Sequence, residues 1–414
     1  MNKFIGYFKD LIFWLLTASF GNQTYQRLVL RSKIKKYQQK LVFEMAPCYP
    51  WRMPLFQRPQ QMALSLARLQ FPFIYYTASP RKDYLFCSRS VEPRLFLSKI
   101  QYRPRLDKPR VVYQFATNHK LLWQDIETEI KLGNLVLYEY LDEISQDLAC
   151  QEIGEEVFER HRRVLADERI FVVVTAQRLY AEVAKYRSKN FILVSNGVDS
   201  SNFSQEKLFG NQNNLLLWRK KDRPIIGYFG ALASWFDYSL IKFLATERPG
   251  WDILLLGFDY DGSLKKSGLS ELSNVHVMGP IPYKSLPHYA KYFDVATIPF
   301  LLNEITLSTN PIKLFEYMAL GRPIVTTNLP ECRKYRSAQI AHTHEEFVQL
   351  IDVSLEIKKH DHCYLETLKE EAYQNSWDHK AQELVDGIYQ TEWYQKNFQI
   401  EGVSSKLSFS PVDA

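Results

Sequence analysis

Short, nearly continuous apolar runs alternate with longer segments of helical period along most of this chain. The runs KLVFEMA (40–46), RVVYQFA (110–116) and NLVLYEYLD (134–142) have the length of strands. The segment 57–70 between the first two places apolar side chains at helical spacing. Strands that are apolar along their whole length are buried on both faces, which is typical of a parallel sheet covered by helices. The pattern therefore predicts an α/β fold.

A polar stretch interrupts this rhythm after residue 203, and the alternation restarts at PIIGYFG (224–230). We expect two doubly wound, Rossmann-like parallel-sheet domains that face a cleft, because such sheets bind ligands at the C-terminal ends of their strands. The predicted parts are an amphipathic and basic N-terminal segment (1–40), a first α/β domain (41–203), a linker (204–222), a second α/β domain (223–375), a C-terminal helix (376–398) and a tail (399–414).

The N-terminal segment FIGYFKDLIFWLLTASF (4–20) is strongly apolar, but Lys9 and Asp10 interrupt it. This pattern suits a helix that lies in a membrane interface better than one that spans it. The basic residues between 27 and 40 would attract anionic lipid. The alternative is a helix that packs on its own domain and turns a basic face to solvent.

Charge and cysteine content limit the other classes of function. The net charge of +6 is modest for 414 residues, which argues against a dedicated nucleic-acid binder. The five cysteines are widely spaced and form no C-x-x-C pair, so we expect reduced cysteines in a cytoplasmic protein.

The segment LSTNPIKLFEYMALGRPIVTT (307–327) is the strongest candidate for a ligand site. Asn310 suits a helix N-cap, Pro311 suits the first helical position, and Gly321 ends the helix. The helix follows a strand, so its N-terminus should reach the edge of the sheet, where free amides and the helix dipole favour a diphosphate. Lys313 adds a positive charge there, and Glu316, one turn further on, can accept hydrogen bonds from ribose hydroxyls. A surface ion pair is the alternative.

Several segments together resemble the GT-B glycosyltransferases, in particular the retaining sugar-nucleotide enzymes that build cell-surface polysaccharides. The resemblance covers about 41–398 and includes FQRPQQMALSLAR (56–68), VSNGVDSSNF (194–203), KLFEYMALGRPIV (313–325) and a crossover helix that begins at SWDHKA (376–381). It implies that a sugar moves from a nucleoside diphosphate donor, expected to be a UDP-sugar, to a growing, lipid-linked glycan. It also implies a metal-independent reaction without another cofactor. By the same resemblance, the domain 41–203 would bind the acceptor, the domain 223–375 would bind the nucleotide sugar, and the helix 376–398 would cross back to the first domain.

The chain departs from the family pattern at two places. Ser308 stands where many members have a second glutamate, and the loop GALASWFD (230–237) lacks the usual Arg and Lys. Diphosphate neutralisation would therefore depend on Lys313 and the helix amides. Both differences leave the donor sugar and the stereochemical outcome open.

Two further side chains follow strands of the first domain and are candidates for catalysis. Asp142 could orient an acceptor hydroxyl or act as its base, whereas in a retaining enzyme the departing phosphate can take the proton. His119 is slightly better explained as a cap or a solvent-facing side chain. The expected catalytic residues are Asp142, His119 and Lys313. The expected donor-binding residues are Glu316, Ser308, Thr309, Asn310, Pro311, Ile312, Gly230, Ala231, Gly279 and Ile281.

Other interpretations stay open. Asp259 and Asp261 form a D-x-D pair, which can hold a metal ion, but the following Gly262 favours a simple turn. Gly230 could equally belong to a tight turn that binds nothing. A sugar-nucleotide epimerase and a non-catalytic GT-B scaffold that binds a partner enzyme or a glycan are the alternative functions.

Overall fold

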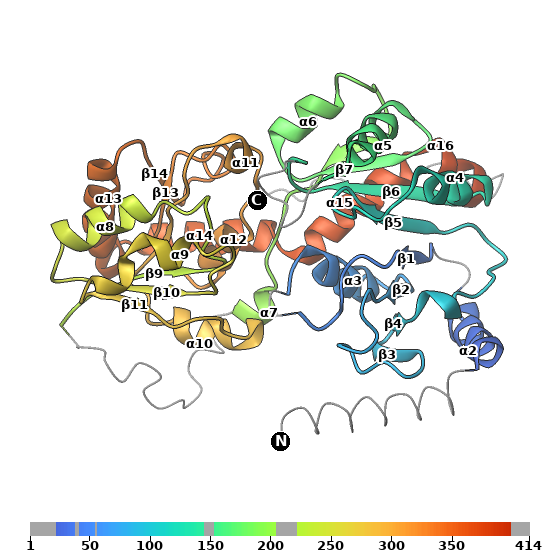
Figure 1. The fold of residues 1–414 in the computed structure, drawn as a ribbon, viewed down its shortest axis with the longest axis horizontal. Helices are drawn as coiled ribbons and strands as arrows, with labels where there is room; N and C mark the ends of the chain where they lie inside the picture. The colour runs from blue at the N-terminus through green and yellow to red at the C-terminus, as the bar shows by residue number, and fades with distance from the viewer. Residues whose placement is uncertain (1–21, 38–40, 54–55, 145–152, 204–221, 399–414) are drawn as a thin grey trace.

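The computed structural model describes residues 22–37, 41–53, 56–144, 153–203 and 222–398. Two α/β lobes lie side by side in Figure 1, and each contains one sheet. The first sheet is built from residues 43–193 and the second from residues 225–341. The expected linker lies almost entirely outside the described residues.

The first lobe contains an eight-stranded sheet with the order β3-β4-β2-β1-β5-β6-β7-β8. All neighbours are parallel except β3 and β4. The strands are β1 (Phe43–Met45), β2 (Phe73–Tyr76), β3 (Arg89–Glu92), β4 (Leu95–Ser98), β5 (Val111–Phe115), β6 (Leu135–Tyr140), β7 (Phe171–Val174) and β8 (Phe191–Leu193). The strand order reverses next to β1, which is the arrangement of a doubly wound sheet.

Helices cover both faces of this sheet, as Figure 1 shows. They are α2 (Gln23–Lys35), α3 (Arg58–Arg68), α4 (Trp123–Lys131), α5 (Glu155–Ala166) and α6 (Gln177–Val183), with a 3₁₀ turn η1 (Ile100–Tyr102). The short α7 (Ser200–Phe203) follows the sheet, and its Phe203 packs in the core of the second lobe. Successive side chains along a strand point to opposite faces of the sheet and pack in two separate cores. Phe43 and Met45 pack with α3, whereas Ile74 and Tyr76 pack with α2 on the opposite face.

The second lobe contains a six-stranded, wholly parallel sheet with the order β11-β10-β9-β12-β13-β14. Its strands are β9 (Ile225–Phe229), β10 (Asp252–Leu256), β11 (Val275–Val277), β12 (Val295–Ile298), β13 (Ile324–Thr327) and β14 (Ala338–Ala341). Its helices are α8 (Tyr238–Glu247), α9 (Ser263–Ser267), α10 (Leu286–Ala290), α11 (Glu304–Leu307), α12 (Ile312–Ala319), α13 (His344–His360) and α14 (His362–Gln374), with 3₁₀ turns η4 (Leu269–Glu271) and η5 (Tyr283–Ser285).

The chain returns to the first lobe after α14. Helix α15 (Trp377–Tyr389) buries Trp377, Leu384 and Ile388 in the core that α3 shares. The sequence predicted one helix over 376–398, but α15 ends at Tyr389 and α16 (Glu392–Phe398) follows. Thr391 explains the break, because its hydroxyl donates to the carbonyl of Ile388 and accepts from the N–H of Tyr394.

Helix α2 shows what part of the basic N-terminal segment does. Leu30 and Ile34 are fully buried against the first sheet, and Arg31 pairs with Asp107. For this helix, the alternative of packing on its own domain is correct. The apolar run 4–20 lies outside the described residues. Among the helices that are described, none has the length and apolar character needed to cross a bilayer.

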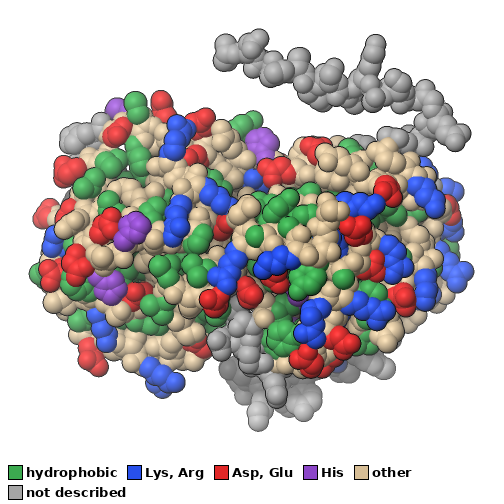
Figure 2. Space-filling view, turned by 90° about the horizontal axis from the view of Figure 1, so that it is seen from above, with side chains coloured by type: hydrophobic (Ala, Val, Ile, Leu, Met, Phe, Trp, Pro, Cys, Tyr) green, Lys and Arg blue, Asp and Glu red, His purple; other side chains and the backbone are tan. Residues whose placement is uncertain are grey.

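Charges of both signs are interspersed over the molecular face shown in Figure 2. The cysteines within the described ranges, Cys48, Cys87, Cys332 and Cys363, are free thiols.

A buried arginine connects α3 of the N-terminal lobe to the junction between the lobes. The Arg58 side chain is 2% exposed, and its Nε donates to Glu139 on β6 at 2.7 Å. Its Nη1 donates to the carbonyl of Ser195 at 2.9 Å and lies 3.4 Å from Oδ1 of Asn196. The ion pair therefore fixes where the chain leaves the first lobe.

We expect Arg58→Ala to lower the free energy of unfolding by about 3–5 kcal/mol, because it leaves the Glu139 carboxylate buried without its cation. The double variant Arg58→Met/Glu139→Leu should lose less than the single variant, since no charge is left buried. Urea denaturation measures both. Arg68→Ala on the same helix is the control, and its half-exposed pair with Asp378 should contribute less than about 1 kcal/mol. Equal losses for Arg58→Ala and Arg68→Ala would contradict the assignment.

Candidate functional site

A pocket of about 310 Å³ lies between the two lobes, at the C-terminal ends of strands from both sheets. The first lobe contributes Tyr49, Phe56, Gln57, Arg58, Asp142 and Asn196. The second lobe contributes residues that follow β9, β10 and β11 and the start of α12. The cleft expected from the sequence is therefore present, and the predicted helix forms one of its walls.

Helix α12 points its N-terminus at this pocket. The N-cap is Pro311 and not Asn310, so the predicted cap is shifted by one residue. The first N–H groups of a helix have no partner within the helix, which leaves donors at this end. Gly321 adopts the expected left-handed conformation after the last turn, with φ of 63°. The helix is also buried more widely than predicted. Its fully buried side chains are Leu314, Phe315, Glu316, Tyr317 and Met318, whereas Ile312 and Ala319 are only half-buried.

Asn310 does not cap α12 because its side chain holds the two lobes together. Its Oδ1 accepts from the N–H of Asn196 at 2.9 Å, and its Nδ2 donates to Glu331 at 3.2 Å. The carbonyl of Asn310 accepts from Nδ2 of Asn196 at 2.7 Å. Glu331 in turn accepts from the N–H of Gln177 in the first lobe. The start of α12 is thus tied to the chain that links the lobes.

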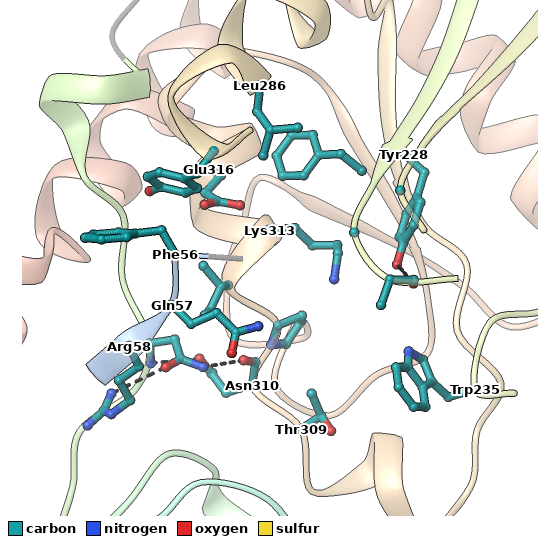
Figure 3. Close-up of a pocket in the computed structure, with 18 of the residues that line it drawn as sticks. Phe56, Gln57, Arg58, Tyr228, Trp235, Leu286, Thr309, Asn310, Lys313 and Glu316 are labelled. Carbon is teal, nitrogen blue, oxygen red and sulfur yellow. Dashed lines mark hydrogen bonds between the residues drawn. The ribbon is translucent and has the colours of Figure 1, made fainter. Parts of the chain in front are cut away.

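Lys313 points into the open middle of the pocket, whereas the guanidinium of Arg58, the other cation in the lining, is turned away (Figure 3). The ammonium lies 4.8 Å from the ring centroid of Phe300 and 5.4 Å from that of Tyr228. Burial lowers the pKa of Lys313 to about 8, and the nearby Glu316 opposes this shift. Burial therefore disfavours the charged form of Lys313, and an anionic ligand beside the ammonium would oppose this shift.

Glu316 lies one turn further along α12, near Phe56 and Leu286 (Figure 3). It is 5% exposed, and burial raises the pKa of its carboxyl to about 8, while Lys313 and the Tyr283 hydroxyl act in the opposite direction. Tyr283 also accepts a hydrogen bond from Nε2 of Gln61 at 2.8 Å. A residue of α3 in the first lobe therefore reaches Glu316 through one tyrosine.

Gly230 keeps the pocket open beside Lys313. Its φ of 142° favours glycine, and a Cβ at this position would lie 2.9 Å from the Tyr228 hydroxyl and 3.0 Å from Cε of Lys313. A Cβ on Gly257 would collide with the carbonyl of Gly230 at 1.8 Å. These glycines let the ends of β9 and β10 approach each other closely. Gly230 and Ala231 line the pocket, as the sequence predicted.

Asp142 reaches the pocket from the first lobe. Burial raises the pKa of its carboxyl to about 6, and the hydroxyl of Thr309 lies 3.5 Å away. The structure therefore brings Asp142 and Thr309 together with Lys313 in one pocket. Asn310, Pro311, Ile312 and Ile281 line it as well.

Three predicted site residues do not line the pocket. Ser308 is fully buried, and its hydroxyl donates to Glu143 across the lobe interface at 2.9 Å. Gly279 precedes the lining residues Pro280 and Ile281 and does not line the pocket itself. His119 lies in the turn after β5, outside the lining. Both Asp142 and His119 were selected because they follow a strand, and this criterion identified a pocket residue only for Asp142.

The sequence analysis missed several aromatic and amide side chains of the pocket. Trp235 lies across from Lys313, and Gln57 extends from the start of α3 towards it (Figure 3). Tyr283 and Phe56 approach each other from opposite lobes with ring centroids 5.7 Å apart. The sequence signal for these residues was weak. Tyr283 follows a turn that contains a glycine, and Trp235 lies in a loop after a strand.

The D-x-D pair is a capping arrangement. Asp259 accepts from the N–H groups of Leu264 and Lys265, and Asp261 accepts from those of Ser234 and Ser263. These bonds fix the loop before α9, which explains the two carboxylates. Within the described residues, no group of three or more His, Cys, Asp or Glu is arranged to hold a metal ion.

Comparisons with known proteins agree with this architecture. Residues 223–352 match the model of the family described as Glycosyl transferases group 1. TuaH of Bacillus subtilis (strain 168), named as a teichuronic acid biosynthesis glycosyltransferase, is 31% identical over 148 residues. That match spans 36% of this chain and 36% of TuaH, which is well short of the relative's full length.

Two solved structures resemble nearly the whole fold. Sucrose-phosphate synthase from Thermosynechococcus elongatus aligns with a TM-score of 0.63 at 13% identity, over 85% of this chain and 98% of that one. Anabaena HepE in complex with UDP aligns with a TM-score of 0.60 at 12% identity, over 85% and 100%. The predicted GT-B fold is therefore confirmed, and so is the resemblance to group 1 glycosyltransferases.

The buried Glu316 generates a prediction about stability and pH. Its folded-state pKa of about 8 lies above the ordinary glutamate value of 4.5, so the folded protein binds the proton more tightly than the unfolded chain does. This contribution to stability is complete below pH 4.5 and is lost as pH rises through 8. We expect Glu316→Gln to gain stability relative to the unmodified protein across this range. Urea denaturation at several pH values measures the difference.

Glu366→Gln is the matched control, because Glu366 is exposed on α14. It should change stability by less than about 0.5 kcal/mol at every pH. A Glu316→Gln profile parallel to that of the unmodified protein would show that the carboxyl is not held protonated.

Proposed function

We propose that this protein is a glycosyltransferase that moves a sugar from a nucleoside diphosphate donor to an acceptor glycan. One observation carries the proposal. The N-terminus of α12, the ammonium of Lys313 and the carboxyl of Glu316 follow one another along a single pocket between two lobes. This order matches the diphosphate and the ribose of a nucleotide. The group 1 match of residues 223–352 supports the same conclusion.

The donor is inferred to be a UDP-sugar. The diphosphate would lie against Lys313 and the first amides of α12, where helix dipole and side-chain charge act together. Glu316 would accept hydrogen bonds from the ribose hydroxyls. The base would contact the turn at Pro280 and Ile281, which lines the same pocket. The solved HepE complex contains UDP within the same fold, which supports this choice of nucleotide.

In the transfer step, the bond between the sugar C1 and the diphosphate oxygen breaks and a bond from C1 to the acceptor oxygen forms. Lys313 and the α12 amides would stabilise the charge that develops on the leaving diphosphate. Asp142 would accept a hydrogen bond from the acceptor hydroxyl and orient it. We infer retention, in which the acceptor proton passes to the departing phosphate. The anomeric configuration of the product, determined by NMR, tests this.

We infer that no metal ion is needed, because Lys313 and the α12 amides can neutralise the diphosphate. Chelation with EDTA should leave the transfer rate unchanged. The acceptor is inferred to be a growing, lipid-linked glycan of the cell surface, in line with the partial match to TuaH. The protein would then work in the cytoplasm at the inner face of the membrane, held by its apolar N-terminal segment.

A thermal-shift series with UDP, GDP, ADP and CMP tests the nucleotide site. UDP should raise the melting temperature, because a ligand that binds only the folded state stabilises it. Glu316→Ala should weaken UDP binding about 10- to 100-fold, since two hydrogen bonds to a carboxyl group are lost. The control is Glu366→Ala, which should bind UDP normally. Unchanged affinity in Glu316→Ala would overturn the ribose assignment.

The same assay separates the alternatives. Stabilisation by UDP without turnover of UDP-sugars across many acceptors would indicate a non-catalytic scaffold. Conversion of the UDP-sugar to its epimer without an acceptor would indicate an epimerase. If no nucleotide stabilises the protein, Lys313 and Glu316 would be assigned a structural role and no role in nucleotide binding.

Removal of residues 1–21 tests the membrane proposal. The truncated protein should no longer sediment with vesicles that contain anionic lipid, because the apolar segment supplies the buried area. The full chain should sediment with them, and less so at high salt, since basic residues add an electrostatic contribution. A truncated protein that still sediments would place the membrane contact elsewhere.

A further inference from the structure

A second cavity lies on the face of the first sheet opposite α3. It has a volume of about 360 Å³, and its floor is formed by β1, β2 and β5 through Glu44, Tyr76, Val112 and Gln114. One wall is the η1 region, and the other is α4 with the loop before it. Figure 1 shows α4 and α2 well apart along this side of the lobe. We call this cavity the outer groove.

Three charged side chains on the floor and walls of the outer groove, Glu44, Arg103 and Glu129, neutralise one another, whereas Lys120 lies at its exposed rim. Arg103 donates from Nε to Glu44 at 2.7 Å and reaches Glu129 on α4 with both terminal nitrogens. Glu44 is also paired with Arg110, and Glu129 accepts from Asn134. Moving a charged ligand from water into the groove costs free energy unless an unpaired opposite charge offsets it. The ion pairs of Glu44, Arg103 and Glu129 leave no such charge in this network. A neutral ligand with many hydroxyl groups fits this wall better.

Gln114 provides a polar contact that the protein itself does not satisfy. The residue lines the outer groove and is 5% exposed, and its Oε1 has no hydrogen-bond partner among the described residues. Buried polar atoms are normally paired, so an unpaired amide oxygen beside a cavity calls for an explanation. Lys120, at the rim of the groove, is exposed and can donate as well.

The outer groove opens beside the pocket between the lobes. Ala46 and Pro47 line the groove, and Tyr49, two residues later, lines the pocket. The Tyr49 hydroxyl is 2.6 Å from that of Thr117, which precedes the groove residue Asn118. The segment that follows β1 therefore contributes to the lining of both cavities.

The loop between the cavities is held in place by a buried arginine. Arg160 donates to the carbonyls of Ala116, Asn118 and Leu121, at 2.7 to 3.0 Å, and is 4% exposed. The rim of the groove is therefore a fixed surface that does not depend on a ligand to order it.

We propose that the outer groove binds a neutral oligosaccharide, namely the part of the acceptor glycan that has already been made; this rests on the proposed glycosyltransferase function. The pocket between the lobes is about as large as the smallest ligand sites, which run from roughly 300 Å³, so a nucleotide sugar leaves little room there. An acceptor longer than its terminal sugar must continue outside that pocket. The outer groove shares the segment after β1 with that pocket, and Arg160 holds its rim in place. It is lined by Gln114 and other polar groups that can form hydrogen bonds with a neutral ligand.

The test is a titration of the full-length protein with defined neutral oligosaccharides of hexose or N-acetylhexosamine units, followed by saturation-transfer NMR in the presence of UDP. At least one of them should bind the unmodified protein. Gln114→Leu and Lys120→Ala should each weaken it about five-fold, as expected for one lost hydrogen bond. Gln114→Leu should keep its melting temperature, because it removes a buried amide that lacks a partner. Lys131→Ala, at the exposed far end of α4, is the matched control and should bind normally.

Three outcomes would overturn the proposal: no oligosaccharide binds, binding is the same in both groove variants, or binding is lost in Asp142→Asn and retained in Gln114→Leu. The last result would place the glycan in the pocket between the lobes alone. The UDP-induced rise in melting temperature is measured in the same samples. If it is present without oligosaccharide binding, the groove proposal fails and the proposed nucleotide site stands. If the UDP-induced rise is absent while the oligosaccharide binds, the proposed nucleotide site fails and the groove proposal stands.

Discussion

The buried guanidinium of Arg58 is the interaction on which the arrangement of the two lobes depends. It joins α3 to β6 and holds the chain at Ser195 and Asn196, where the first sheet ends. Asn196 then binds Asn310, immediately before α12. Because a buried ion pair is weak evidence for added stability, the main effect of this one is geometric. It sets the direction in which α12 approaches the pocket from the other lobe.

Burial disfavours the charged forms of two side chains that α12 contributes to the pocket, and this is consistent with a binding role. It shifts the pKa of Lys313 downwards and that of Glu316 upwards. A ligand that brings a diphosphate to Lys313 would favour the charged lysine again. Strongly perturbed groups in a cleft are frequent at functional sites, although structural pairs show the same effect.

Much of the fold could be predicted from the sequence, because its strands are long apolar runs with clear boundaries. The runs at 110–116 and 134–142 became β5 and β6. The hairpin of β3 and β4 was missed, since β3 is partly exposed and has no apolar run. Lys313 and Glu316 were found because helix signals surround them. Tyr283, Gln61 and Trp235 were not, because their roles arise only when two distant segments meet. Ser308 was predicted to bind the donor but does not line the pocket, because its hydroxyl donates to Glu143 of the other lobe instead.

The hydrogen bond between Gln61 and Tyr283 has a thermodynamic consequence. Tyr283 touches Glu316 in one lobe while Gln61 holds it from the other. Any ligand that displaces the tyrosine from Glu316 also alters a bond that keeps the lobes together. Coupling free energies are reciprocal, so whatever separates the lobes must change the affinity for that ligand by the same factor. Ligand occupancy beside Glu316 and separation of the lobes are therefore coupled equilibria.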